Sequence, residues 1–142
     1  MNHRTNSGFT LIEIMVVVVI LGVLASIVVP RVMDRPDEAR LTKAKHDIHS
    51  LEAALRLYRL DNYSFPTTDQ GMEALVKKPS IEPIPANWKK GGYLDRLPKD
   101  PWQTPYKYIS PGTHGTIDIY SLGADNQEGG EDMNTDINNW TE

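Results

Sequence analysis

One apolar segment near the N-terminus, Gly8 to Pro30 (GFTLIEIMVVVVILGVLASIVVP), limits what this chain can fold into. From Phe9 to Val29 the residues are apolar or small, and the polar exceptions are Thr10, Glu13 and Ser26. A continuous helix over that stretch would rise about 31 Å, at ~1.5 Å per residue, which matches the ~30 Å hydrocarbon core of a bilayer. The segment therefore predicts a membrane-spanning helix.

Glu13 does not suit a passive anchor. An ionised carboxylate inside an apolar span costs roughly 2.5–3.5 kcal/mol on insertion scales, so such a residue indicates a function and a partner. The alternative is a side chain that reaches back to the membrane surface, which the nearby end of the helix allows.

The residues before the apolar segment, MNHRTNS, are polar and include Arg4 as their fixed positive charge. Positive residues stay on the cytoplasmic side, so we expect the N-terminus inside and the C-terminal part across the membrane. A cleavable secretory signal is the alternative, because Val23–Ala25 is an acceptable cleavage site before Ser26. The apolar run, however, exceeds the usual 7–15 residues of such a signal.

Charge distribution and cysteine content restrict the classes of function and of stabilising interaction open to this chain. The 142 residues carry a formal net charge of −4, and Lys and Arg stop at Lys107. The acidic residues after that point are Asp118, Asp125, Glu128, Glu131, Asp132, Asp136 and Glu142. This bias argues against a nucleic-acid partner, which requires clustered basic residues. With no cysteine in the chain, an exported domain must obtain stability from a core, a metal or a partner subunit.

A second helical pattern follows the apolar segment. Pro30 predicts a kink or local melting, and Pro36 after Asp34 indicates a helix start. Apolar residues then recur at steps of three and four, which predicts an amphipathic helix to about Leu60. Those residues are Leu41, Ala44, Ile48, Leu51, Leu55 and Tyr58. His46 and His49 lie off that stripe and are predicted to face solvent rather than to bind a metal.

The rest of the chain predicts short elements. A short helix is expected from Thr68 or Asp69 to Leu75, followed by a proline-rich loop that Trp88 and Tyr93 pin to the core. Strands are predicted at 106–109 and around 117–120, with turn chemistry at 111–115 between them. A small antiparallel sheet packed on the helix would give an α+β domain. His114 has no partners at catalytic spacing, and no nucleophile–base pair appears, so an anchored enzyme is disfavoured.

The acidic C-terminal stretch LGADNQEGGEDMNTDINNW offers hard oxygen ligands at flexible spacing, which suit Ca²⁺ better than a transition metal. The spacing is not that of an EF-hand. Composition alone leaves a calcium site and a solvated acidic turn as alternatives.

The motif GFTLIEIMVVVVILGVLA resembles the leader and N-terminal helix of type IV pilins and type II secretion pseudopilins. The resemblance implies that a prepilin peptidase cuts between Gly8 and Phe9 and N-methylates Phe9. Residues 1–8 would be the leader, 9–30 first a membrane anchor and then the filament core, and 31–142 the periplasmic domain. Glu13, the fifth residue of the mature chain, would pair with the amine of Phe9, its own or a neighbour's, and set the register between subunits.

Three further segments, YSFPTTDQGMEAL, GGYLDRLPKDPWQTPYKY and DIYSLGADNQEGG, resemble the major, G-type pseudopilins of type II secretion. The resemblance implies a type IV pilin-like fold and a non-enzymatic subunit that polymerises into the periplasmic pseudopilus from the inner membrane, for export of folded proteins. Its implied partners are further copies, minor pseudopilins and the inner-membrane assembly platform. The alternatives are a type IV pilin, which commonly carries a C-terminal disulfide, or a soluble calcium-binding domain released after Ala25.

The same resemblance implies one Ca²⁺ per subunit, held in the C-terminal loop. The matching positions are Asp125, Asp136 and the backbone carbonyl of Leu122. Asp132 and the carbonyl of Met133 are further candidates. The cation would replace the missing disulfide by tying the loop together.

Overall fold

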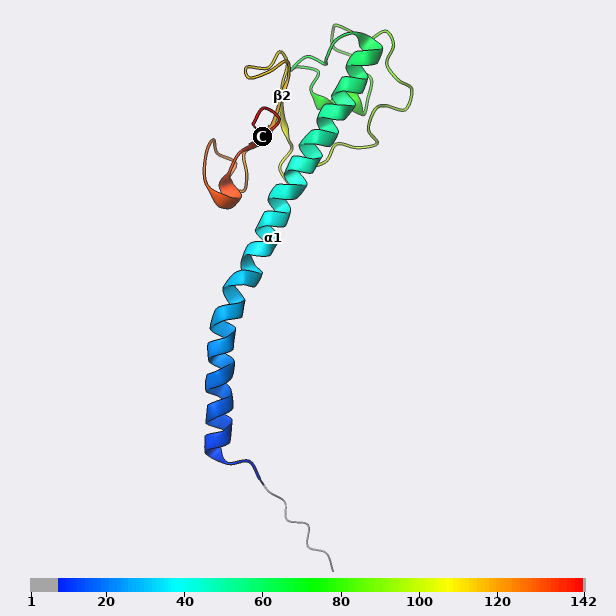
Figure 1. Ribbon diagram of the computed structural model, residues 1–142. Helices are drawn as coiled ribbons and strands as arrows, with labels where there is room; N and C mark the ends of the chain where they lie inside the picture. Colours follow the sequence, from blue (N-terminus) through cyan, green and yellow to red (C-terminus); the bar gives the residue numbers. More distant parts are fainter. Residues whose placement is uncertain (1–7, 142) are drawn as a thin grey trace, which may run out of the picture. The chain divides into compact units, whose positions relative to one another are not determined.

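The structure is a computed structural model that describes residues 8–141, except for the side chains of residues 28–35. The chain divides into two compact units, Met1–Pro36 and Asp37–Glu142. The elements, in chain order, are α1 (Leu11–Asn62), η1 (Met72–Leu75), β1 (Lys107–Ile109), β2 (Asp118–Ser121), η2 (Asp132–Asn134) and β3 (Ile137–Asn138) (Figure 1).

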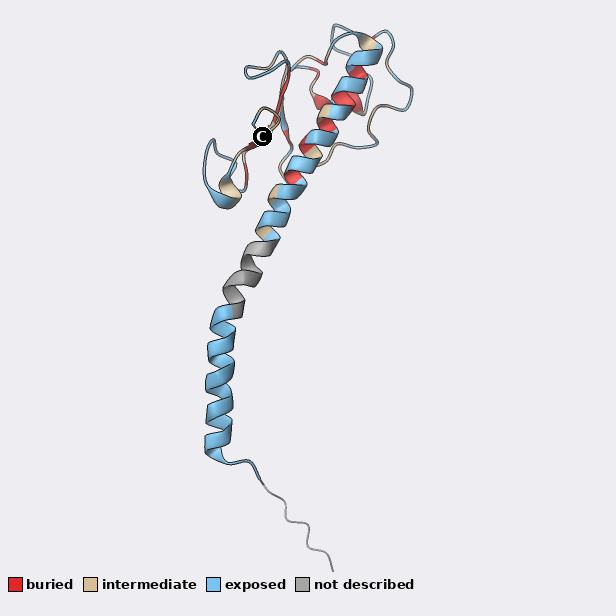
Figure 2. Ribbon diagram, in the orientation of Figure 1, coloured by how far each residue is buried: buried red, intermediate tan, exposed pale blue. Residues whose placement is uncertain are grey.

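The first unit contains the start of α1. Its large apolar side chains from Phe9 to Ile27 are between 51% and 86% exposed, so this part of the helix has no covered face (Figure 2). Within the described residues, no helix is both long and apolar enough to cross a membrane. The helix passes through Pro30 and Pro36 without a break, so the separate helix start expected at Pro36 is wrong. The kink expected at Pro30 falls on residues 28–35, whose side chains lie outside the described part of the chain.

The second unit is built on the predicted helix stripe. Five of its six members, from Ala44 to Tyr58, are at most 2% exposed, and Leu41 packs against the core beside them. The rest of the core comes from η1 and the sheet, including Leu75, Ile119 and Ile137. His46 and His49 are exposed, as predicted.

The sheet has three antiparallel strands in the order β1-β2-β3. Tyr108 lies opposite Ile119 in the first pair, and Ser121 lies opposite Ile137 in the second. The two predicted strands are confirmed, with β1 beginning at Lys107. β3 is a two-residue strand inside the acidic C-terminal region, where too few residues alternate for the sequence to predict a strand.

The proline-rich loop between α1 and β1 is held against the core by Trp88 and Tyr93, as expected. The Trp88 indole N–H donates to the carbonyl of Ala74 at 2.8 Å, and both Trp88 and Tyr93 pack against the core. The predicted short helix is a 3₁₀ turn, η1, which begins after Gly71 rather than after Thr68 or Asp69.

Candidate functional site

The predicted processing point lies in an irregular, exposed segment. Gly8, Phe9 and Thr10 precede α1 and have no regular secondary structure. The Phe9 side chain is 86% exposed. A peptidase can bind such a bond in extended form without unfolding a helix.

Glu13 forms a capping box with Thr10 at the start of α1. The Thr10 backbone N–H and hydroxyl both donate to Glu13 Oε2, at 2.8 and 2.9 Å, and the Glu13 N–H donates to Thr10 Oγ1 at 3.3 Å. The Thr-x-x-Glu spacing is the signal for this arrangement, and the sequence analysis did not use it. In the uncut chain, Thr10 is therefore the partner of the Glu13 carboxylate.

The acidic loop between β2 and β3 is held in a tight backbone fold. Gly123 and Gly130 have φ angles of +67° and +102°, and a Cβ on either would lie within 3.0 Å of Asn134. The Ala124 N–H donates to the carbonyl of Met133 at 2.9 Å, which joins the two ends of the loop. Glycines at these two positions allow the backbone segments to approach each other.

The structure brings some of the predicted calcium ligands together. Leu122 and Asp136 line one cavity, together with Glu128, which the sequence analysis did not select as a ligand. Asp132 lines a separate groove that Asp136 also borders. Asp125 lines neither, and its Oδ1 accepts a hydrogen bond from the Gln127 N–H at 3.1 Å.

Asp136 is the ligand candidate whose carboxylate has a buried oxygen without a hydrogen-bond partner. Its Oδ2 accepts the Gly129 N–H at 2.8 Å, whereas its Oδ1 is buried without a hydrogen-bond partner. A buried carboxylate oxygen without a partner is unfavourable unless a donor or cation reaches it. Over the described residues, no cluster of three or more His, Cys, Asp or Glu side chains is arranged to hold a metal. A cation here would therefore need backbone carbonyls among its ligands.

Beside that cavity, an acidic side chain organises the 111–115 turn. Asp118, on β2, is 1% exposed and accepts bonds from the N–H groups of Thr113, His114 and Gly115 and from the Thr113 hydroxyl. Burial raises the pKa of Asp118, but these bonds outweigh burial and lower it from 3.8 to about 2. The carboxylate thus fixes the turn in its ionised form.

Trp140 packs the C-terminal end of the loop against this turn and against β2. Its ring stacks on His114 with centroids 4.1 Å apart and meets Tyr120 edge-on at 5.8 Å. His114 Nδ1 lies 3.0 Å from Asp118 Oδ2. The histidine is therefore a packing partner of this cluster.

Two family models match the chain. The model described as "Type II secretion system (T2SS), protein G" matches residues 31–140, and "Prokaryotic N-terminal methylation motif" matches residues 3–29. Together they span both units.

Whole-chain relatives agree with these matches. "Type II secretion system core protein G" of Pseudomonas aeruginosa is 62% identical over 140 residues, which cover 99% of each chain. The protein of the same name from Vibrio cholerae is 58% identical and covers 96% of this chain and 93% of its own.

A solved structure also matches: the major pseudopilin from the type 2 secretion system of enterohaemorrhagic Escherichia coli. It has a TM-score of 0.69 and 46% identity, and the match covers 80% of this chain and 96% of that one. The motif resemblance and the predicted helix-and-sheet fold are thereby confirmed, and the type IV pilin alternative is not favoured. The chain belongs to the type II secretion system protein G family.

Proposed function

We propose that this chain is the repeating subunit of a pseudopilus, and that its work is structural rather than enzymatic. The observation that carries the proposal is the helix from Leu11 to Ile27, whose apolar side chains are exposed on all sides. A helix that is apolar all round requires an apolar surrounding, either lipid or other helices. Family membership and the N-terminal methylation motif support copies of the same helix as that surrounding.

Processing precedes assembly in this proposal. A prepilin peptidase cuts between Gly8 and Phe9 and methylates the new amine of Phe9. The exposed, irregular segment before α1 supports this step. The apolar segment then stays on the mature chain instead of leaving with the leader.

Before assembly the subunit is held in the inner membrane by the segment 9–30, with Arg4 on the cytoplasmic side and residues 31–142 in the periplasm. The length and apolar character of the sequence support this anchor. From there the subunit enters the pseudopilus through the assembly platform, together with minor pseudopilins, and the filament drives export of folded proteins across the outer membrane.

Glu13 has a second partner after cleavage. The cut creates an amine at Phe9, four residues from Glu13, and a neighbouring subunit carries the same amine. A pair between a carboxylate and an amine in an apolar filament core would offset the burial of both and fix the axial register. The capping bonds to Thr10 keep the carboxylate satisfied until that partner is available.

We also propose one Ca²⁺ in the acidic loop. The unpaired, buried Oδ1 of Asp136 supports a cation, and carboxylates with carbonyls are the donor set that Ca²⁺ prefers. Asp136, Asp125 and the carbonyl of Leu122 would hold it, with Asp132 and the Met133 carbonyl as further candidates. When bound, the cation would neutralise two of the five carboxylate charges of the loop.

The test is complementation in a bacterium whose own protein G gene is deleted. The full chain should restore secretion of a folded substrate. A Phe9→Asp variant, expressed to the same level, should not, because a charge at the new N-terminus disturbs processing and packing. Full secretion with this variant, or no secretion with the unsubstituted chain, would contradict the proposal.

A further inference from the structure

The end of the second unit where α1 finishes carries apolar side chains that the described part of the chain leaves in solvent. Leu57, Leu60 and Tyr63 are 52%, 73% and 85% exposed. Tyr63 follows the last helical residue with a φ of +62°, a left-handed conformation that glycine adopts more easily at a helix end. The chain thus places an aromatic ring in solvent at a strained position, which stability alone does not explain. We call these three residues the distal patch.

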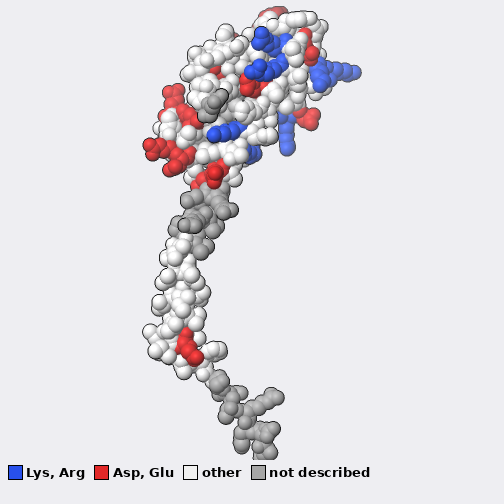
Figure 3. All heavy atoms as spheres, in the orientation of Figure 1, with Lys and Arg blue, Asp and Glu red and all other residues white. Residues whose placement is uncertain are grey.

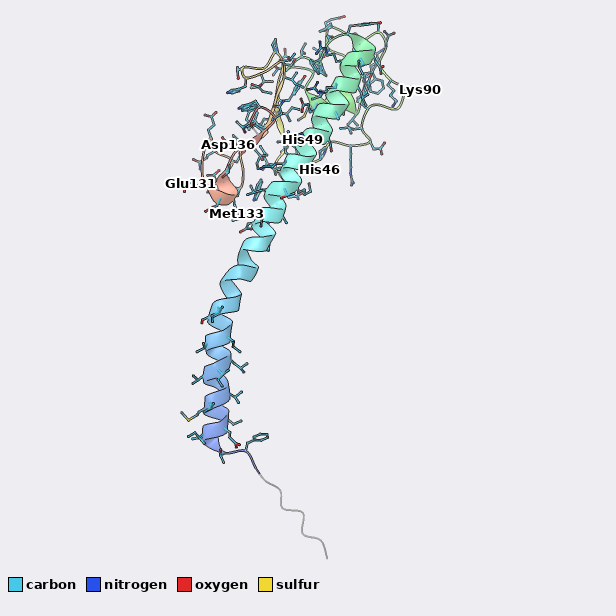
Figure 4. The ribbon with its side chains drawn as sticks, in the orientation of Figure 1. His46, His49, Lys90, Glu131, Met133 and Asp136 are labelled. Atoms are coloured by element: carbon cyan, nitrogen blue, oxygen red, sulfur yellow. The ribbon has the colours of Figure 1, made fainter. Side chains whose placement is uncertain are left out.

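Basic side chains lie beside the distal patch. The Tyr93 hydroxyl donates to Asp61 Oδ2 at 2.9 Å and accepts the N–H of Lys89 at 3.4 Å, which fixes the Lys89–Lys90 loop against the last turn of α1. Residues 77–99 contain six basic and two acidic side chains. Figure 3 shows basic side chains at this end of the unit, and Figure 4 shows Lys90 there.

The acidic loop lies at the other end of the same unit. The Sδ of Met133 is 3.9 Å from Arg40 Nη1, near the start of the unit's part of α1. From Arg40 to Asp61 the helix rises about 31 Å at ~1.5 Å per residue. Figure 4 places Glu131 and Lys90 at opposite ends of the unit accordingly. The loop has five carboxylates between residues 122 and 136, and no Lys or Arg follows Lys107.

We propose that these two ends bind each other between copies of this chain, head to tail. The distal patch and Lys89–Lys90 of one copy contact the acidic loop of the next copy, on the face that carries Glu131. The inference rests on the proposed function, because it takes the copies to be filament subunits.

Charge complementarity selects a second copy as the occupant. The distal end is basic, and the acidic loop is the oppositely charged surface available on every neighbouring subunit. A bound Ca²⁺ would cancel two of the five negative charges and leave the loop acidic. Contact between two different surfaces repeats without closing on itself, which is the geometry of an open filament. Opposite charges around an apolar centre then fix the register of the contact.

The test uses the absence of cysteine from the sequence. The full chain carrying Lys90→Cys and Glu131→Cys is assembled into filaments and oxidised. Since these positions lie at opposite ends of the second unit, a disulfide between them must join two copies. We expect a ladder of dimers, trimers and longer oligomers, with dimers at most from either single substitution.

The matched control replaces Lys90→Cys with Lys107→Cys, which is exposed on β1, and keeps Glu131→Cys. That pair should give no ladder. A second experiment uses the chain without cysteines. Lys90→Glu should lower the filament yield by up to about fivefold, which is the effect expected from losing one exposed charge pair. Adding Glu131→Lys to the same chain should restore the yield.

The outcomes separate the two proposals. Filaments that form without a ladder, or a ladder as strong in the Lys107 control, would overturn the head-to-tail contact and leave the pseudopilus subunit in place. If the unsubstituted chain forms no filaments under conditions that support a relative's assembly, the proposed function itself is wrong.

Discussion

At the scale of single residues, the ionisation of Asp118 contributes to the stability of the domain. Its pKa is lowered from 3.8 to about 2 in the folded state, so its ionised form stabilises the domain above pH ~4. That contribution is lost as the pH falls from about 4 to about 2. We expect the acid unfolding midpoint of the full chain in detergent to shift upward in Asp118→Asn, measured by near-ultraviolet circular dichroism.

Asp118→Asn should also lower the free energy of unfolding at neutral pH by about 1–3 kcal/mol, because several donors in the 113–115 turn lose a buried, charged acceptor. The exposed carboxylate Asp69 offers a matched control, and Asp69→Asn should leave both the stability and the acid midpoint unchanged. Identical acid unfolding curves for the two variants would contradict this role of Asp118.

Residue by residue, the sequence predicted burial better than hydrogen bonding. The apolar stripe on α1 could be read from spacing alone, because periodicity reports which face is covered. In the predicted strand at 117–120, side chains alternate between two faces, which places Asp118 opposite Ile117 and Ile119 and gives no sign that a turn would bury it. Its partners are mostly backbone N–H groups, which leave no pattern in side-chain identity.

At the scale of elements, the second half of α1 should contribute most of the core energy. Leu51 is 1% exposed, so Leu51→Ala should cost about 2–5 kcal/mol. Leu57 lies on the same helix but is 52% exposed, and Leu57→Ala should cost less than about 0.5 kcal/mol. Urea unfolding of the full chain in detergent measures both, and equal losses would mean that the burial pattern is wrong.

The acidic loop is the element expected to respond to calcium. Asp136→Ala removes the buried, unpaired oxygen, so the melting temperature should become insensitive to EDTA. The unsubstituted chain should melt at a lower temperature after chelation and recover with added Ca²⁺. An EDTA-independent melting temperature in the unsubstituted chain would remove the calcium proposal.

The helix, the strands and the acidic loop differ in how well the sequence could predict them. Six apolar positions at helical spacing predicted the second half of α1, whereas β3 rests on two residues whose pairing with β2 depends on tertiary contacts. The loop's acidic composition was visible, but its ligand geometry was not. Gly123 and Gly130 set that geometry by allowing close contact with Asn134, and nothing in the sequence identifies Asn134 as their neighbour.

At the scale of the whole molecule, substitutions at Thr10 and Glu13 distinguish helix capping from the proposed role of Glu13 in filament assembly. Thr10→Ala and Glu13→Ala both break the capping box at the start of α1. If Glu13 also pairs with the amine of Phe9, only Glu13→Ala should lose filaments while it is still cut and inserted. Counting filaments by electron microscopy, after confirming equal processing, makes the comparison. Equal filament yields from the two variants would limit Glu13 to capping.

The most direct test of the whole account is the mass of the chain recovered from purified filaments. If cleavage, methylation and assembly occur as proposed, the mature chain begins at Phe9, carries one methyl group on its amine and retains residues 9–30 as the filament core. A chain that begins at Ser26, or filaments that lack this chain, would contradict it.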